Sequence, residues 1–433
     1  MERYSEYKDS GVKWLGEIPS HWEVMPIKHI SKVNSGATPK TSVQGYWDGN
    51  ITWVTPADFK TDTKFVLKGN RNITSLGVKS CSTVLLPKGS LVFSKRAPIG
   101  QVSISKLPLC TNQGCFGIIP NESMNNCFLY YSLAIHAKSF NTLGSGTTFR
   151  ELSFSAFSSY KISVPPKAEQ DAIVRYLDAA TSKIDKAIAM QQKMIDLLNE
   201  RKQIIIQNAV TKGIDENVEM KDSGVEWIGM IPKHWEISKL KYLIDAPLKY
   251  GANEASDLID YSCPRYIRIT DIDTNGKLKE ETYRSLPMNK AEPYLLKKGD
   301  LLFARSGATV GKAFLFEEDY AACYAGYLIK AHMDLQKVLP KFVYLYTQTF
   351  AYQRWKESIF IQATIQNISG ERYANMQIPM PTLEEQNNII DMLTPKMLRF
   401  DSVISNCQRQ ITLLQERKQI IINEVVTGKV KVS

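Results

Sequence analysis

The stretch Lys8–Glu23, KDSGVKWLGEIPSHWE, returns at Lys221–Glu236 as KDSGVEWIGMIPKHWE, with twelve of sixteen positions identical. Two Trp-rich segments this similar indicate an internal repeat, and the repeat decides how the rest of the chain is divided. We call these two copies the His-Trp segments, after the HW pair that both contain. The remaining sequence also falls into two copies of one unit.

Three further pairs of segments follow in the same order in both halves. They are PKGSLVFSKRAPIGQ from Pro87 with KKGDLLFARSGATVGK from Lys297, ISVPPKAEQDAIVRYLD from Ile162 with IPMPTLEEQNNIIDMLT from Ile378, and LLNERKQIII from Leu197 with LLQERKQIII from Leu413. The last pair is identical at nine of ten positions. The chain is therefore a duplicated unit whose copies have diverged unevenly.

The repeat predicts four segments. A chain of 433 residues exceeds what one hydrophobic core usually supports. We expect a first globular domain at residues 1–166, a first long helix at 167–212, a linker with a second globular domain at 213–382, and a second long helix with the C-terminal tail at 383–433. The tail corresponds to the connector after the first helix, so it should end near the N-terminus.

Apolar residues recur every three or four positions in both predicted helices, which is typical of a near-heptad stripe. The T-x-x-E pattern at Thr382–Glu385 predicts a capping box at the start of the second helix. The first helix keeps Glu169 at the corresponding place but has Pro166 instead of the threonine. Pro395 lacks the amide hydrogen that a helix interior needs, so we expect a kink or a restart there.

A helix of about forty residues is ~60 Å long, which exceeds the diameter of one globular domain of this chain. Each stripe is too narrow for a fully buried helix and too apolar to face water. We therefore expect the two helices to pack on each other as an antiparallel coiled coil; the alternative is that each packs on its own globular domain. The predicted helix–helix seam consists of Ile184, Leu198, Ile205, Phe400, Leu414 and Ile421.

The globular segments mix both kinds of secondary structure. Runs such as SLVFS, CFGIIP and LLFAR are typical of strands, and FLYYSLAIHAKSF and VYLYTQTFAYQRWKE have helical spacing. The predicted fold class is α+β. It comprises two similar mixed α/β domains separated by two long helices that form an antiparallel coiled coil, with a pseudo-two-fold internal repeat.

The sequence contains no complete catalytic pattern. GATVGK from Gly307 has three residues between its glycines and no Ser or Thr after the Lys, so it is not a Walker A loop. The ERK motif at Glu200 and at Glu416 matches half of a nuclease site. It lies in a helical stripe, however, where a salt bridge on the helix surface is the simpler interpretation. No zinc spacing, nucleophile motif or cofactor fingerprint is present. We expect a non-catalytic chain that holds no metal and no cofactor.

Compartment and partners follow from composition. Seven scattered cysteines without a CxxC pair indicate reduced thiols, and no run of eighteen apolar residues exists, so we expect a cytoplasmic location without a membrane partner. The formal net charge is +10, which favours polyanionic partners. Two similar domains at a fixed separation suit duplex DNA, on which they can read two half-sites one helical turn or more apart.

The His-Trp segments, GDLLFARSGATVGK, the P-x-x-EQ helix starts and ERKQIII together resemble the specificity subunit of Type I restriction–modification systems. The resemblance covers essentially the whole chain. It implies two target-recognition domains, each reading one half of a split, asymmetric DNA site, and two central helices that set the spacer. It also implies two methyltransferase subunits that carry S-adenosylmethionine, and restriction subunits that use ATP and Mg. This chain itself would supply no catalytic residue.

The loops between the matching segments differ in charge and length, so we expect them to carry the DNA contacts. Arg and Lys suit guanine edges, and Asn and Gln suit adenine. For the first half-site we predict Thr38, Lys40, Lys95, Arg96, Thr148 and Arg150. For the second half-site we predict Asn253, Arg268, Arg305, Ser306, Thr364 and Gln366. For each of these, the alternatives are a phosphate contact or a solvated loop residue.

Three other interpretations remain at this point. The chain could serve a methylation-only or phage-exclusion system, because that difference lies in neighbouring chains. It could be a stand-alone nuclease or methyltransferase, which would act without partners. It could also be a scaffold that joins two protein-binding domains, which would show no sequence-selective DNA binding.

Overall fold

Both long helices connect two compact units. The computed structural model describes residues 2–59, 63–144, 150–273, 276–307, 309–360 and 366–432. Unit 1 consists of Met1–Gln191 and Arg409–Ser433, and unit 2 of Gln192–Gln408. Each unit therefore contains one globular block and one half of each long helix.

The inner strands of the main sheet of unit 1 are buried on both faces. In sheet order the strands of this sheet are β4 (Ser31–Ser35), β11 (Cys115–Pro120), β8 (Leu91–Ser94), β9 (Val102–Ser105) and β6 (Phe65–Val66), and only the β6–β9 pair is parallel. Successive side chains of a strand point to opposite faces. Leu91 and Phe93 accordingly enter the larger core of the unit, whereas Val92 between them enters a smaller core on the other face.

A second, smaller sheet forms a separate lobe of unit 1. It consists of β10 (Leu109–Thr111), β5 (Trp47–Val54) and β7 (Arg71–Ile73), with β10 parallel and β7 antiparallel to β5. Trp47, Trp53, Ile73 and Cys110 form its own small core. The remaining elements of unit 1 are α1 (Ile27–Ile30), η1 (Gln44–Tyr46), η2 (Pro56–Asp58), α2 (Ser75–Lys79), α3 (Asn126–Ile135), α4 (Ala137–Leu143) and α5 (Phe154–Ser158).

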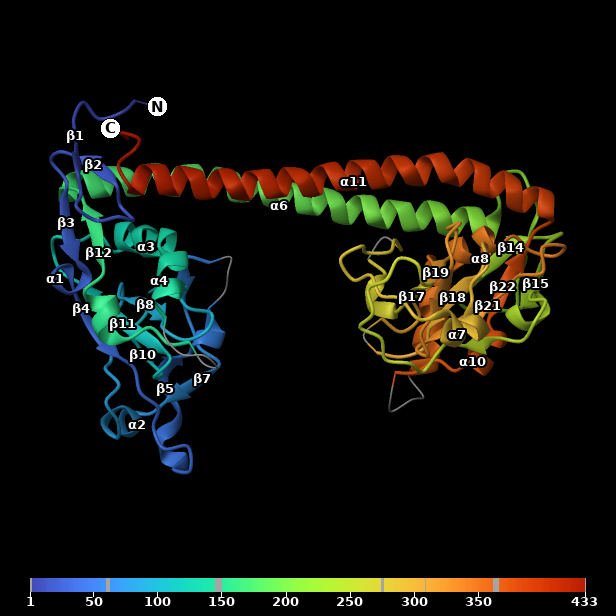
Figure 1. The fold of residues 1–433 in the computed structure, drawn as a ribbon, viewed down its shortest axis with the longest axis horizontal. Coiled ribbons are helices and arrows are strands. Elements are labelled where there is room, and N and C mark those ends of the chain that lie inside the picture. The colour runs from blue at the N-terminus through green and yellow to red at the C-terminus, as the bar shows by residue number, and fades with distance from the viewer. Residues whose placement is uncertain are drawn as a thin grey trace. The chain divides into compact units, whose positions relative to one another are not determined.

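Unit 2 repeats this plan. Its antiparallel main sheet has the order β16 (Lys249–Tyr250), β21 (Leu328–Ala331), β18 (Leu301–Ala304) and β19 (Ala313–Leu315), and its second lobe pairs β17 (Arg265–Ile267) with β20 (Ala322–Tyr324) in parallel. The other elements are η3 (Leu240–Tyr242), η4 (Ile269–Asp271), α7 (Met288–Ala291), η5 (Glu292–Tyr294), α8 (Pro340–Tyr346), α9 (Phe350–Phe360) and α10 (Gly370–Ala374). Figure 1 shows both units and labels many of these elements. The predicted duplication thus extends to the order of the strands.

The His-Trp segments fasten each globular block to the start of a long helix. Each forms a hairpin, β1 (Tyr7–Asp9) with β2 (Glu17–Pro19) and β13 (Met220–Asp222) with β14 (Met230–Pro232), and then continues into a strand, β3 (Glu23–Pro26) or β15 (Glu236–Lys239). Those strands pair with β12 (Lys161–Val164) and β22 (Gln377–Met380), which lead directly into the long helices.

One glutamate in the first turn of each helix receives the His-Trp pair. The buried Trp22 donates its indole N–H to Glu169 at 3.2 Å, and His21 lies 2.9 Å from the same carboxylate. In unit 2, Glu385 accepts from Trp235 at 3.1 Å and lies 2.8 Å from the ring nitrogen of His234. The repeated HW pair is therefore a joint between the globular block and the helix.

This joint makes the stability of unit 2 depend on pH. Burial opposes ionisation of Glu385, but hydrogen bonds from His234, Trp235 and Thr382 outweigh it and lower its pKa from 4.5 to about 2. Because the pKa is depressed on folding, the stabilisation is present above about pH 4.5 and is lost as the pH falls toward 2. Glu385→Gln should therefore lower the free energy of unfolding near neutral pH, and this loss should shrink on acidification.

The measurement is denaturant unfolding of wild type and Glu385→Gln from pH 7 downward. Glu384→Gln is the matched control, because Glu384 is an exposed carboxylate in the same first turn. An unfolding free-energy difference between Glu385→Gln and wild type that stays constant across the acidic range would show that the ionised Glu385 does not hold the joint.

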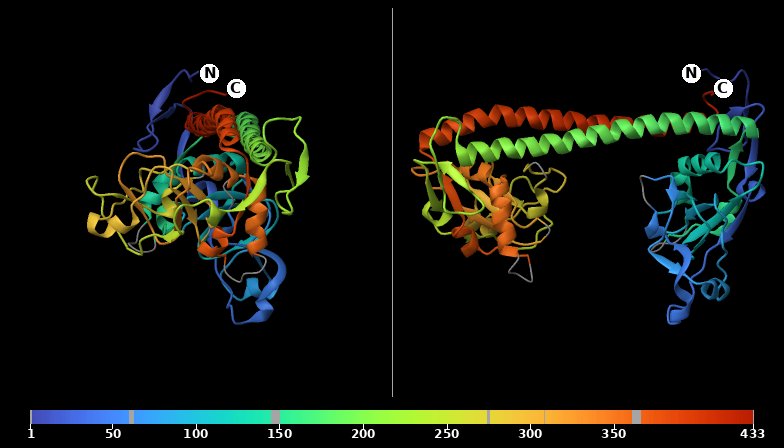
Figure 2. Two further views of the ribbon diagram at one scale, coloured as in Figure 1. Left: turned by 90° about the vertical axis from the view of Figure 1, so that its right-hand side faces the viewer. Right: turned by 180° about the vertical axis from the view of Figure 1, so that it is seen from behind.

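The long helices are α6 (Lys167–Lys212) and α11 (Leu383–Val426). Within unit 1, Ile173 and Leu177 of α6 share a core with Ile422 and Val425 of α11, and Lys418 lies 2.6 Å from Asp185. The beginning of α6 therefore lies beside the end of α11, which is an antiparallel arrangement. Figure 2 shows α6 and α11 end-on and from behind.

Unit 2 contains the complementary halves in the same arrangement. The end of α6, with Ile206 and Val210, shares the unit 2 core with Ile389 and Leu393 from the beginning of α11. Lys202 and Asp401 form an ion pair at 2.6 Å. The predicted antiparallel pairing is confirmed within each unit. The helix ends also pack on the globular blocks, so both packing modes that the sequence suggested occur together.

The expectation of a restart at Pro395 is wrong. Helix α11 runs through Pro395 without interruption. Pro395 is exposed, so the backbone carbonyl of Asp391 that loses its partner is at the solvent side of the helix. Leu393 and Met397 on either side are buried in the unit 2 core, and this packing favours a continuous helix.

The predicted seam residues are buried to different degrees. Ile184 is buried, whereas Leu198, Ile205, Phe400, Leu414 and Ile421 are half-buried. The neighbours Ile206 and Ile422 are the buried members of the two ERKQIII segments, because they face the cores of the globular blocks. The stripe of buried residues along each long helix is therefore wider than the seam of a simple coiled coil.

The end of the chain returns to its beginning within unit 1, as expected from the repeat. The backbone N–H of Lys431 donates to the carbonyl of Glu2 at 2.9 Å, and the Tyr7 hydroxyl donates to the carbonyl of Gly428 at 3.1 Å. Gly428 occupies the left-handed region with φ of 75° where the chain leaves α11.

Candidate nucleic-acid interface

Three segments of unit 1 that carry or adjoin predicted contact residues meet a fourth segment, residues 111–114, at one place. The N–H of Ala37 donates to the carbonyl of Thr111 at 3.0 Å, and Thr38 is hydrogen-bonded to Gln113. The N–H of Lys95 donates to Gly114 at 2.9 Å, and Leu152 donates to the carbonyl of Lys95 at 2.9 Å. Backbone contacts thus bring the segments at residues 37–38, 111–114, 95–96 and 151–152 together.

Glu151 holds two of the predicted cations in this cluster. Its carboxylate lies 2.8 Å from Lys95 and 2.9 Å from the Nε of Arg96. Partial burial opposes ionisation of Glu151, but these two partners keep its pKa below the usual value. Within the described residues only the Nε of Arg96 is engaged, so its two terminal NH₂ groups remain available for a ligand.

The corresponding segments of unit 2 meet in the same way. Ala252 donates to the carbonyl of Tyr324 at 2.8 Å, Arg305 donates to Tyr327 at 3.0 Å, and Ile368 donates to the carbonyl of Arg305 at 2.8 Å. Isolated bridges join Arg96 with Glu151 in unit 1 and Ser306 with Asn367 in unit 2. The two units therefore build equivalent clusters from different side chains.

Arg305 is presented differently from Lys95, its equivalent in unit 1. Its guanidinium lies 4.8 Å from the ring centroid of Tyr250, and the hydroxyl of Tyr250 accepts a hydrogen bond from Gly370 at 2.9 Å. Arg305 has no ion pair with a carboxylate among the described residues. Stacking on an anchored ring orients the planar group and leaves its N–H edges free for a polar partner.

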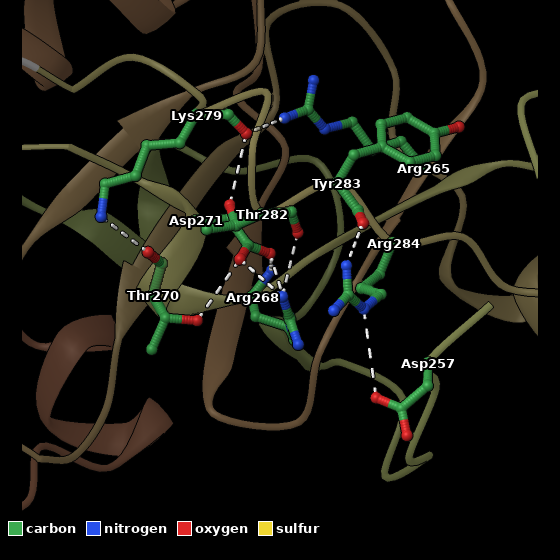
Figure 3. A network of polar contacts seen from close by, with 9 residues as sticks. All are labelled: Asp257, Arg265, Arg268, Thr270, Asp271, Lys279, Thr282, Tyr283 and Arg284. Carbon is green, nitrogen blue, oxygen red and sulfur yellow. Dashed lines mark hydrogen bonds and ion pairs between the residues drawn. The ribbon is translucent and has the colours of Figure 1, made fainter. Parts of the chain in front are cut away.

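Arg268 has a structural partner of its own. Its Nε and Nη2 donate to Asp271 at 3.1 and 2.9 Å, and Nη2 also donates to the carbonyl of Thr282 at 3.0 Å. Figure 3 shows these bonds beside Arg265, which donates to the carbonyl of Lys279 at 2.7 Å. Asp271 also accepts the backbone N–H of Arg268 at 2.8 Å, as Asp58 accepts that of Thr55 at 2.7 Å in unit 1. Most of the donor capacity of Arg268 is therefore used inside the lobe.

The other predicted contact residues lie on loops. Lys40, Arg150, Asn253 and Gln366 are exposed, and Ser306 is partly exposed. Thr148 and Thr364 lie outside the described residues.

Two further properties bear on the kind of site. The seven cysteines are free thiols. In the part of the chain that the structure describes, no three His, Cys, Asp or Glu residues gather as a metal-binding group. Among the same residues, no helix has the length and apolar character needed to cross a membrane.

The comparison with protein families shows the family to which the chain belongs. A family described as the Type I restriction modification DNA specificity domain matches the chain twice, at residues 19–194 and 232–411. The chain belongs to this family. It is a DNA-specificity subunit of the Type I restriction–modification kind, which is not the catalytic kind of subunit.

Curated relatives of this specificity subunit align along almost its whole length. The MjaIX specificity subunit of Methanocaldococcus jannaschii is 25% identical over 99% of this chain and 97% of its own. The EcoBI specificity subunit of Escherichia coli is 20% identical over 98% of this chain and 89% of its own. A chain from a solved type I restriction–modification system has a TM-score of 0.70 at 15% identity, covering 95% of this chain and 99% of that one.

Several residues that shape the clusters of the specificity subunit were missed from sequence. Glu151, Gln113 and Tyr250 lie far along the chain from the residues they hold, and no local motif marks them. The only signal was positional, since Glu151 directly follows the predicted contact Arg150.

Proposed function

We propose that this specificity subunit reads a bipartite, asymmetric DNA site, one half with residues 1–166 and the other with residues 213–382. The observation that carries the proposal is the equivalence of the two loop clusters. The same backbone hydrogen bonds present different side chains in the two units. A shared frame with different readers suits two half-sites of different sequence.

The charge of the two clusters differs in a way that predicts different preferences. In unit 1, the cations Lys95 and Arg96 are accompanied by the carboxylate of Glu151. In unit 2, Arg305 is stacked on Tyr250, beside the polar side chains of Ser306 and Asn367. An Arg with free edge donors is suited to the two acceptors of guanine in the major groove.

We further propose that the long helices set the spacing of the half-sites. Asp185 and Lys202 are 17 residues apart in α6, and their partners Lys418 and Asp401 are 17 residues apart in α11. The two ion pairs, one in each unit, thus follow the same antiparallel register. Since an α-helix rises ~1.5 Å per residue, helix length determines spacer length.

The partners proposed are two methyltransferase subunits carrying S-adenosylmethionine, and restriction subunits carrying ATP and Mg. The two ERKQIII segments support two equivalent docking surfaces for the methyltransferases. Leu197 and Ile204 are 50% and 44% exposed, and their equivalents Leu413 and Ile420 are 53% and 55% exposed. Apolar side chains this exposed, seven residues apart on each helix, suit a partner helix. A methylation-only or phage-exclusion system would use the same surfaces. The assembly would act in the cytoplasm.

Replacing Arg305 tests the assignment of the second half-site. Arg305→Ala in the assembled complex should lower discrimination at one base pair of that half-site by about 1–3 kcal/mol, and leave the other half-site unchanged. The measurement is a genome-wide map of adenine methylation in the host. Arg354→Ala is the matched control, because Arg354 is an exposed arginine of α9 in the same unit. Weakening of both half-sites would contradict the assignment.

The rival activities have their own readouts. Cleavage or methyl transfer by the purified chain alone would favour a stand-alone enzyme. A complex of the chain with its methyltransferases that binds all duplexes alike would favour a scaffold.

A further inference from the structure

One arginine of unit 1 is held in the manner of Arg305 although no sequence motif marks it. Arg71 is the first residue of β7 and lies opposite Trp53 in β5. Its guanidinium carbon lies 3.6 Å from the ring centroid of Trp47, which is only 5% exposed. Arg71 itself is exposed. Its planar group therefore rests on a fixed aromatic surface while its N–H edges face solvent.

No described residue forms an ion pair or a hydrogen bond with the guanidinium of Arg71. The nearby capping carboxylate of Asp58 is occupied, since it accepts from the backbone of Thr55 at 2.7 Å and of Asn70 at 2.8 Å. By contrast, Lys95 and Arg96 share Glu151. The charge and the donors of Arg71 thus remain uncommitted within the described part of unit 1.

The same tryptophans hold the loop that carries two predicted DNA contacts. Trp47 donates its indole N–H to the carbonyl of Lys40 at 3.2 Å, and Trp53 donates to the carbonyl of Ala37 at 3.0 Å. Arg71 therefore lies on the ring that anchors the loop containing Thr38 and Lys40. Fixed aromatic packing connects it to the unit 1 cluster.

We propose that Arg71 is a base-reading residue of the first half-site and that it contacts a guanine edge. The proposal rests on the proposed function and names a residue of the same site. A guanidinium held in one plane loses little freedom on forming two parallel hydrogen bonds, and guanine offers two acceptors, N7 and O6, at the matching spacing. Arg71 and Arg305, each stacked on an aromatic ring, would then make the same kind of base contact in the two units.

The test uses the complete complex with the native chain replaced by Arg71→Gln, by Arg71→Lys or by Lys79→Gln. Lys79 is the matched control, an exposed cation in the last turn of α2 in the same lobe. Binding is measured on a duplex carrying the methylated motif and on duplexes with one first-half base pair changed, over a range of salt concentrations. Arg71→Lys keeps the charge, so it serves as the readout if Arg71→Gln does not fold.

Arg71→Gln should reduce discrimination at one G·C pair of the first half-site about 10- to 100-fold, with the second half-site unchanged. Arg71→Lys should recover the salt dependence but only part of the discrimination. Lys79→Gln should behave as wild type.

Equal weakening on all duplexes, with a salt slope lowered by about one, would place Arg71 on a phosphate and overturn the base contact. Unchanged discrimination by Arg71→Gln would also overturn the base contact. If the wild-type complex still recognises a bipartite motif in that case, the proposed function is unaffected. A wild-type complex that recognises no bipartite motif would refute both.

Discussion

Inserting seven residues into both long helices is expected to lengthen the spacer of the DNA site by about three base pairs and to leave both half-sites unchanged. Seven residues extend a helix by ~10 Å, and base pairs of B-DNA are ~3.4 Å apart. A heptad keeps the packing phase of the stripe. The insertions belong after Gln191 and after Gln408, where the chain passes from one unit to the other. The methylated motif in the host is the readout.

A chain with the insertion in α6 alone is the control. It would shift the register set by the ion pairs Asp185–Lys418 and Lys202–Asp401, so methylation should be lost rather than respaced. A doubly extended chain that methylates the original motif with the original spacer would contradict the role of the helices as spacer.

Replacing residues 221–382 by a second copy of residues 8–166 is expected to convert the asymmetric site into a symmetric one. Both halves of the new motif should match the half-site read by unit 1, and the half read by unit 2 should disappear entirely. The physical basis of this expectation is the joint between the globular block and the start of the long helix. The transplanted His21 and Trp22 would meet Glu385, as they meet Glu169 in their own unit.

The reciprocal chain, with residues 221–382 in both places, is the matched control and should give a symmetric motif built from the other half-site. Methylation maps of the host carrying each chain provide the measurement. If a chain with two identical blocks keeps the asymmetric motif, the globular blocks are not the readers.

The sequence predicted the features that repeat or are periodic. Paired segments revealed the duplication, and apolar spacing gave the long helices, because both signals are local or occur twice. The T-x-x-E pattern also identified Glu385, whose carboxylate accepts from Thr382 and from the His-Trp pair. The same reasoning misjudged Pro395, because the packing of Leu393 and Met397 outweighs one missing hydrogen bond.

The candidate site was predictable only in part. Lys95 and Arg305 were predicted because each follows a strand at the same place in the repeat. They differ in their partners: Glu151 lies beside Lys95, and Tyr250 lies beneath Arg305. Both partners come from distant segments of the chain. Arg71 shows the same limit, since its stacking on Trp47 comes from the pairing of β5 with β7 and from no local pattern.

We propose that this chain chooses the DNA sequence on which its partners act. A genome-wide map of methylated adenine, made in the host and in a strain that lacks only this chain, tests it most directly. The expected result is one bipartite motif with two different halves, present in the first strain and absent from the second. A motif that persists without the chain, or one with a single uninterrupted recognition sequence, would contradict it.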